Sequence, residues 1–281
     1  MNHLVFITKS NGQRELFEEG KLINSLSRVG ASAQAVDEVI DEVGKSVRDG
    51  MSSTEIYSKA FALLRKHHPP TAVKYSIRRA LLELGPDGFP FEKFVARIFQ
   101  LWGYETLTDQ IVMGACVVHE VDVVAWKEDK LAMVEAKFHN EIELKSDLKV
   151  VLYVKSRFDD ISEMVFDYGG VKRNLKERYL ITNTKFTDQA IKYSMCKGLM
   201  LIGWNHPLKG NLHDIIEKNG LHPITCLTSL THQEKKDLIG RDILVCVDLA
   251  KNQAILNNIG VKKDRIDGII AETIMVIEQA K

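Results

Sequence analysis

The sequence has few cysteines and no long hydrophobic run. Its cysteines form no Cys-x-x-Cys pair and lie far apart, at Cys116, Cys196, Cys226 and Cys246. This spacing argues against a zinc site or a disulfide framework. No apolar run approaches the ~18 residues needed to span a membrane, and the first residues lack the pattern of a signal peptide. We therefore expect no membrane association and a location in the reduced cytoplasm.

The sequence also lacks an excess of charge of either sign. Its 38 lysine and arginine residues balance 38 aspartate and glutamate residues, so any contact with nucleic acid must come from a local basic patch. Two basic runs are candidates for such a patch, although charge runs on helices are usually solvated faces. They are Lys145, Lys149, Lys155 and Arg157, and then Lys172, Arg173, Lys176 and Arg178.

The N-terminal part of the chain predicts a small hairpin followed by helices. Residues 4–17 contain two apolar segments around Asn11-Gly12, and Asn-Gly is the strongest two-residue hairpin signal. Ser52 and Glu55 have the spacing of a capping box, and a proline pair suits the start of the last helix. The four helices are expected at 18–29, 32–48, 53–67 and 70–84.

The rest of the 281-residue chain predicts an α/β fold with a mixed sheet, followed by a helical region. The segment "GPDGFP" at 85–90 reads as a linker, so we expect domains at 1–85, 86–208 and 209–281. The helix face from Phe91 to Trp102 has apolar residues at helical spacing. Further elements are expected as a helix at 142–163, a strand at 178–183, a helix at 186–198 and a strand at 199–204, which is a βαβ order.

The stretch "HEVDVVAWKEDKLAMVEAKFH", residues 119–139, predicts an apolar hairpin that is interrupted by charge. A hairpin centred on Glu128 and Asp129 places Asp122 directly opposite Glu135. Cross-strand partners have Cβ atoms about 4.5–5.5 Å apart, where like charges are destabilising. A divalent cation would relieve this repulsion, and Mg²⁺ is commonly held by one or two carboxylates.

Lys137 follows Glu135 by two residues and therefore lies on the same face of the strand. Its ammonium group can contact a phosphate or a nucleophilic water, or stabilise developing charge. The alternative interpretation is an edge hairpin whose charged residues simply face water.

The region 91–204 resembles the restriction-endonuclease-like superfamily with the PD-(D/E)xK signature, in its Mrr-type and archaeal resolvase-like branch. The resemblance rests on Asp122, on Glu135-Ala136-Lys137 and on the segment "YLITNTKFTDQAIKY" that follows. Val121 stands where the family name has proline. The resemblance implies Mg²⁺- or Mn²⁺-dependent hydrolysis of DNA, with Asp122 and Glu135 holding metal and Lys137 assisting the attacking water.

Three further residues near this motif have open roles. Glu92 occupies the acid position of many relatives in the opening helix, but an acid in a first turn is favoured by the helix dipole whatever its function. We treat it as a candidate catalytic residue. His119 and His139 flank the motif, and strand-end histidines more often form structural hydrogen bonds.

The first 85 residues resemble an ATP-cone, the nucleotide-binding regulatory domain of ribonucleotide reductases. The resemblance rests on "ITKSNGQRELFEEGKLINSL" and "AVKYSIRRAL". It implies that ATP or dATP contacts Lys9, Gly12, Lys21, Tyr75 and Arg79. The familiar Lys-Arg-Asp-Gly turn is reduced here to Lys9-Ser10-Asn11-Gly12, with one cation fewer for phosphate. The alternative is a solvated basic face on a small helical domain.

Together these patterns predict a metal-dependent DNA endonuclease that binds adenine nucleotide and forms a homo-oligomer. Alternatives are a nucleotide-sensing DNA-binding regulator without catalysis, and a structure-specific nuclease acting on junctions or RNA. Gly44-Lys45-Ser46 only mimics the end of a P-loop, because position 39 is valine and no strand precedes it. We therefore expect nucleotide binding without ATP hydrolysis.

Overall fold

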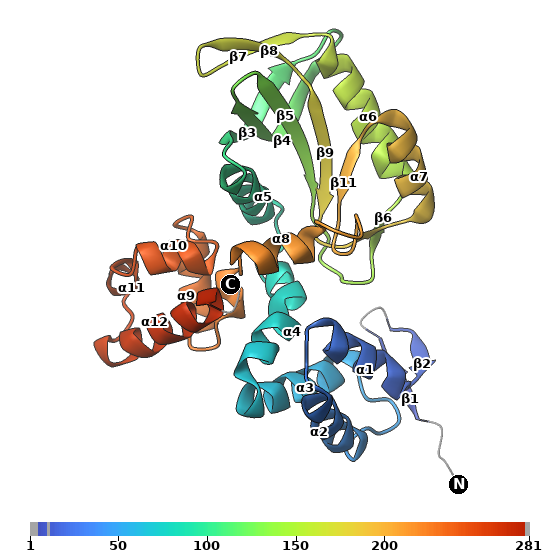
Figure 1. The fold of residues 1–281 in the computed structure, drawn as a ribbon, viewed down its shortest axis with the longest axis vertical. Coiled ribbons are helices and arrows are strands. Elements are labelled where there is room, and N and C mark those ends of the chain that lie inside the picture. Colours follow the sequence, from blue (N-terminus) through green and yellow to red (C-terminus); the bar gives the residue numbers. More distant parts are fainter. Residues whose placement is uncertain (1–4, 10–11, 279–281) are drawn as a thin grey trace. The chain divides into compact units, whose positions relative to one another are not determined.

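The computed structural model describes residues 5–9 and 12–278, and it divides into two compact units. Unit 1 is Met1–Ile77 and unit 2 is Arg78–Lys281. Figure 1 shows the order of the elements along the chain. The predicted division of unit 2 after residue 208 stays a prediction.

Unit 1 is a two-stranded hairpin followed by helices, as predicted. Strands β1 (Phe6–Thr8) and β2 (Arg14–Leu16) pair antiparallel; Asn11, on which the turn prediction rested, lies outside the described residues. The helices are α1 (Glu19–Arg28), α2 (Ala33–Gly44), α3 (Ser53–His67) and α4 (Pro69–Leu82), the last running across the unit boundary.

The helices of unit 1 form because apolar residues recur at helical spacing, and in α2 and α3 a serine side chain also caps the first turn. In α3 the capping box between Ser52 and Glu55 is present, as predicted. The Ser52 hydroxyl accepts a hydrogen bond from the Glu55 amide at 3.1 Å, and the Glu55 carboxylate accepts one from the Ser52 amide at 2.8 Å. The core of the unit includes Leu26, Val39, Val43, Ala60 and Leu64.

Unit 2 is built on a five-stranded mixed sheet with strand order β11-β9-β5-β4-β3. Strands β3, β4 and β5 are antiparallel, whereas β5, β9 and β11 are parallel. The crossover from β9 to β11 passes through α7, which confirms the predicted βαβ order. The bounds are β3 (Glu105–Met113), β4 (Val118–Lys127), β5 (Lys130–Lys137), β9 (Glu177–Thr182), β11 (Met200–Ile202) and α7 (Asp188–Lys197).

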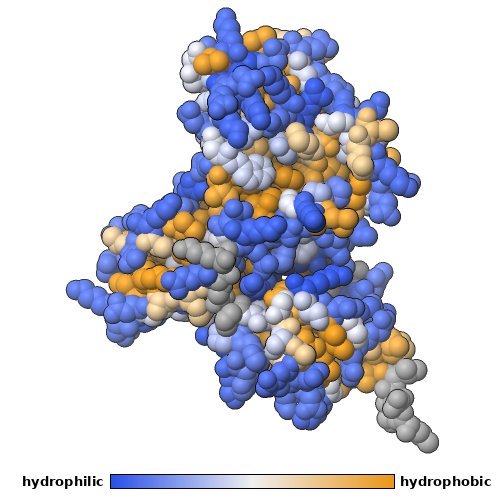
Figure 2. Space-filling model, viewed as in Figure 1, coloured by the Kyte–Doolittle hydropathy of each residue, from blue (hydrophilic) through white to orange (hydrophobic). Residues whose placement is uncertain are grey.

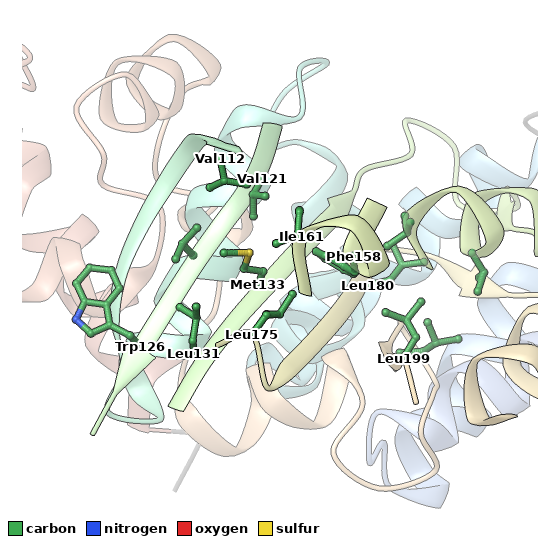
Figure 3. Close-up of a cluster of buried hydrophobic side chains, with 14 of the residues drawn as sticks. Val112, Val121, Trp126, Leu131, Met133, Phe158, Ile161, Leu175, Leu180 and Leu199 are labelled. Atoms are coloured by element: carbon green, nitrogen blue, oxygen red, sulfur yellow. The ribbon is translucent and has the colours of Figure 1, made fainter. Parts of the chain in front are cut away.

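Helices cover both faces of this sheet. Helix α5 (Phe89–Leu101) lies beside one face, and α6 (Leu148–Ser162) and α7 lie beside the other (Figure 1). The α6 face is a continuous core in which Phe158 and Ile161 meet Met133 and Leu180 of the sheet (Figure 3). The predicted linker therefore ends at Gly88, because Phe89 and Pro90 already belong to the first turn of α5.

Some elements of unit 2 differ from the prediction. Helix α6 begins at Leu148 rather than at 142, because the Asp147 carboxylate accepts hydrogen bonds from the Lys149 and Val150 amides and caps the helix there. The preceding residues instead form β6 (Lys145–Ser146), which pairs with β10 (Lys185–Phe186). The prediction also missed β3 and the hairpin of β7 (Val165–Tyr168) and β8 (Val171–Asn174).

The C-terminal part of unit 2 is helical, as predicted. It comprises α8 (Leu212–Asn219), a 3₁₀ turn (Ile224–Cys226), α9 (His232–Ile239), α10 (Cys246–Lys251), α11 (Ile255–Asn258) and α12 (Lys263–Glu278). The predicted capping box of Thr231 and Glu234 opens α9. Within the described residues, no helix is both long and apolar enough to cross a membrane. The face shown in Figure 2 carries both hydrophilic and hydrophobic residues.

Candidate functional site

The β4–β5 hairpin has the register that the sequence predicts. Val123 pairs with Val134 and Lys127 with Lys130, so the next position along would set Asp122 opposite Glu135. The strand pairing stops there, because the Asp122 carboxylate itself accepts the hydrogen bond of the Ala136 amide, at 2.6 Å. A side chain thus replaces the strand backbone as the partner of β5 at this one position.

Strand β4 is also interrupted on its other side at Asp122. In the pairing with β3, Thr108 faces Val123 and Gln110 faces Val121, and the residues between them, Asp109 and Asp122, are skipped. Asp109 has a φ of 55°, a left-handed conformation that aspartate tolerates better than most residues. Irregularities of this kind redirect side chains and are common beside functional sites.

Burial and mutual repulsion act on the two hairpin acids. Burial raises the pKa of Asp122, and the Ala136 amide and Arg157 oppose that shift. Burial, and then the neighbouring Asp122 charge, raise the pKa of Glu135 to about 7, against the opposing effects of Arg157 and Lys137. Two carboxyl groups are therefore held together at a cost that a bound cation would reduce.

Glu92 joins this acidic cluster from the first turn of α5. The N-cap of this helix is Gly88, which has no side chain to cap it. Burial, and then the charges of Asp122, Asp109, Glu120 and Glu135, together raise the pKa of Glu92 to about 7. Since each of these carboxylates acts on Glu92, the fold brings the predicted acid within electrostatic reach of the hairpin pair. A role in stabilising the first turn of α5 would not by itself explain why Glu92 lies near four other carboxyl groups.

Lys137 lies at the end of β5, two residues beyond Glu135, and its side chain is exposed. Its charge lowers the pKa values of both Asp122 and Glu135, which shows that it lies close enough to act on them. The position suits a group that meets a ligand arriving from solvent.

Arg157 of α6 also lies in this cluster, which the sequence did not predict. Its guanidinium forms an ion pair with the Glu135 carboxylate, and both side chains are largely shielded, at 14% and 17% exposure. It also donates hydrogen bonds to the Glu120 carbonyl at 3.0 Å and to the Tyr153 hydroxyl at 2.9 Å. From the sequence, Arg157 was a candidate for a basic surface patch. Only its spacing of four residues from Tyr153 indicated that the two side chains could meet on one face of the helix.

Other residues proposed from the sequence have structural partners instead. His119 contacts the Asp160 carboxylate at 2.7 Å, which lowers the pKa of Asp160 to about 2. His139 contacts the Ser146 hydroxyl at 3.0 Å and exchanges backbone hydrogen bonds with the Asn183 amide group. Arg173, a candidate for the basic patch, is buried and donates to three backbone carbonyls, so its side chain is engaged within the fold.

The residues predicted to contact nucleotide fall into two groups. In the hairpin region of unit 1, Glu15 bridges Lys9 at 2.8 Å and Lys21 at 3.3 Å, and Lys21 also reaches Glu18. Gly12 has a φ of 81°, which glycine adopts without strain. One carboxylate thus neutralises the two lysines that a phosphate group would otherwise meet.

The other two predicted contacts lie on α4. Tyr75 stacks on Tyr57 with ring centroids 5.0 Å apart, and burial raises its pKa. Arg79 follows the boundary between the units and lies 3.9 Å from Glu83. Tyr75 therefore contributes to the core of unit 1 in addition to any role in binding.

Comparisons with known proteins find a family match near each end of the chain. Residues 5–83 match the ATP cone domain, and residues 222–277 match a model described as AF1548-like, C-terminal. A protein of Archaeoglobus fulgidus described as uncharacterized is 34% identical over 184 residues, which cover 65% of this chain and 99% of that protein. The chain belongs to the AF1548-like family.

A solved structure supports the same relationship. A crystal structure titled as a protein of unknown function, AF1548, is similar to the chain with a TM-score of 0.56 and 33% identity. The match covers 68% of this chain and 99% of that one. The family model confirms the ATP-cone prediction for the N-terminal domain, and the match supports nucleotide binding there. The AF1548-like C-terminal domain was not predicted, because its helices carry capping signals but no motif.

The acidic cluster of this AF1548-like protein offers the right atoms for a divalent cation. Across the described ranges, no group of three or more His, Cys, Asp and Glu side chains could hold a metal ion. Mg²⁺, however, is commonly held by one or two carboxylates that share it with waters and phosphate oxygens. Asp122 and Glu135 are such a pair: burial raises the pKa of both carboxyl groups, and the Asp122 charge raises that of Glu135 further. Their donor chemistry therefore fits Mg²⁺ or Mn²⁺.

Proposed function

We propose that this AF1548-like protein is a metal-dependent nuclease whose activity is regulated by ATP or dATP at its ATP-cone. The observation that carries the proposal is the interruption of β4 at Asp122, opposite Glu135, with Lys137 next on the same side of β5. Hairpins seldom retain two facing acids in apolar strands, since like charges there are destabilising. A catalytic site explains why these were kept.

Each residue of the cluster has a distinct part in this proposal. Asp122 and Glu135 would hold Mg²⁺ or Mn²⁺, which supplies charge neutralisation and a more acidic bound water. Lys137, exposed and adjacent, binds a phosphate oxygen and stabilises charge that develops during hydrolysis. Glu92, with a pKa of about 7, can accept a proton near neutral pH.

We propose DNA as the substrate, and junctions or RNA as the alternatives that the same site would serve. Phosphodiester hydrolysis by carboxylates, a lysine and a cation does not depend on the base sequence, so one site can act on several nucleic acids. Lys145 and Lys149 are exposed and remain candidates for contacts to the nucleic-acid backbone.

A second candidate is a nucleotide-sensing DNA-binding protein that does not cleave. The observation in its favour is the ion pair between Arg157 and Glu135, which already neutralises one of the two acids. In that case the cluster is a structural element of the fold, and a cation has no place in it.

A substrate panel distinguishes the two candidates. Purified full-length protein is incubated with plasmid, branched DNA, single-stranded DNA and RNA, with Mg²⁺, Mn²⁺ or a chelator, and with or without ATP. The nuclease proposal expects cleavage of at least one substrate only when metal is present, at a rate that ATP changes. Binding of DNA without cleavage under every condition would favour the second candidate.

A further inference from the structure

Arg157 is fixed at Glu135 by contacts from three directions. Its Nη1 forms the ion pair with Glu135 and also donates to the Glu120 carbonyl, while its Nη2 donates to the Tyr153 hydroxyl. The guanidinium carbon lies 4.9 Å from the centroid of the Tyr153 ring. These contacts hold a cation in the acidic cluster in a defined orientation.

The acidic cluster needs such a cation when no metal is bound. A carboxylate that is shielded from water and lies beside a second carboxylate is costly unless it is paired. Arginine meets this need well, because it stays charged and its planar donors fit a carboxylate. Arg157 donates to Oε2 of Glu135, and the proposed function assigns the same carboxylate to a divalent cation.

We propose that Arg157 is an internal counter-cation that holds Glu135 in the metal-free protein and must release it before a divalent cation binds to Asp122 and Glu135. This inference rests on the proposed metal site. The apparent affinity for metal is then reduced by the fraction of molecules in which Glu135 is free. Arg157 is a positioning residue here, since it acts through Glu135.

Calorimetry with Mn²⁺ on the full-length protein tests this directly. If Glu135 is released in about one molecule in ten, Arg157→Ala should bind Mn²⁺ about tenfold more tightly than the wild type. A residue with only a structural role would leave the affinity unchanged or weaken it. The matched control is Lys155→Ala, which removes a cation of the same helix whose partner is Asp159; its Mn²⁺ affinity should stay within about twofold of wild type.

A second variant keeps every charge in place. Tyr153→Phe removes the hydroxyl that accepts from Arg157 Nη2, so Glu135 should be released more often and Mn²⁺ should bind about two- to threefold more tightly. If Arg157→Ala does not fold, Tyr153→Phe still tests whether Arg157 acts as a counter-cation to Glu135.

The outcomes separate this inference from the function on which it rests. Wild-type Mn²⁺ binding that neither Arg157→Ala nor Tyr153→Phe tightens would overturn the counter-cation role and leave the metal site standing. An equal increase in Mn²⁺ affinity in Lys155→Ala would also overturn the counter-cation role, because the increase would then follow from a general loss of positive charge. Absence of Mn²⁺ binding in the folded wild type and in all variants would reject the metal site itself, and the inference with it.

Discussion

At the scale of single residues, the proposed function gives Lys137 a role separate from that of the two acids. Lys137→Ala removes the exposed cation beside Glu135 while both acids remain, so metal binding should be largely kept. Loss of an electrostatic contact to the reacting phosphate typically costs about 10²–10³ in rate. Single-turnover cleavage measures the effect, and Lys130→Ala is the control, since Lys130 lies at the other end of β5 near Glu177. If Lys137→Ala cleaves at the wild-type rate, Lys137 has no part in catalysis.

Glu92 makes a prediction about stability and pH. Because its pKa is about 7 in the folded protein and near 4.5 when exposed, the folded state binds more protons between these values. The free energy of unfolding therefore falls as pH rises through this window. Glu92→Gln removes the contribution of Glu92 to this pH dependence. In metal-free urea unfolding, the free energy of unfolding of the variant should exceed that of wild type by about 1 kcal/mol at pH 8, after allowing for solvent screening. This difference in the free energy of unfolding should be smaller at pH 5. A difference that is equal at pH 5 and pH 8 would contradict the raised pKa of Glu92.

At the predicted nucleotide site, Glu15 forms ion pairs with Lys9 and Lys21. Lys21→Ala should weaken ATP binding to the full-length protein several-fold, because a phosphate loses one charged partner. Lys45→Ala is the matched control: Lys45 lies in the same unit and pairs with Asp41 and Glu42 outside the predicted site. Calorimetry in which both variants bind ATP like the wild type would remove Lys21 from the nucleotide site.

At the scale of elements, helix α6 depends on its cap. Asp147→Ala removes the acceptor of two amide hydrogen bonds, and loss of such a cap typically costs about 1 kcal/mol. Asp159→Ala, near the other end of α6, breaks only an ion pair between the exposed Asp159 and the largely shielded Lys155. It should cost about 0.5 kcal/mol, which is less than loss of the cap. Urea unfolding compares the two; equal losses would show that the cap does not set the start of the helix.

The elements that local patterns specify were predicted well, and those that depend on distant pairing were not. The hairpin register around Glu128 and Asp129 follows from strand alternation and a polar turn, so it could be read from sequence. Strand β3 lies at the sheet edge with alternate residues exposed, and its pattern "ETLTDQIVM" held a strand signal that was missed. The pair of β6 and β10 joins two-residue strands 40 positions apart, which no local pattern indicates.

The candidate site divides in the same way. Asp122, Glu135 and Lys137 are close because of one local register, and the sequence alone could place them. Arg157 reaches Glu135 only because α6 packs on the sheet through Phe158 and Ile161. Its contact is a product of tertiary packing, which is why the sequence suggested only a basic surface.

At the scale of the whole molecule, the ATP-cone and the AF1548-like part must communicate for the proposed regulation to work. A ligand shifts an equilibrium only by its different affinity for the two states, and such couplings are typically about 1–3 kcal/mol, or ~5–150-fold. We expect ATP to change the oligomer size or the cleavage rate within this range, and a non-hydrolysable analogue to do the same. An effect that needs hydrolysable ATP would contradict a simple allosteric role.

The central claim is that Asp122 and Glu135 form a metal-dependent nuclease site, and one comparison tests it most directly. Cleavage by the wild type is measured with Mn²⁺ beside Asp122→Asn, Glu135→Gln and the control Asp129→Asn, whose acid lies at the hairpin turn and pairs with Lys176. We predict that wild type and Asp129→Asn cleave alike and that each site variant, still folded, loses at least about 10²-fold in rate. Undiminished cleavage by either site variant, or a folded wild type that cleaves nothing with Mn²⁺ or Mg²⁺, would contradict the claim.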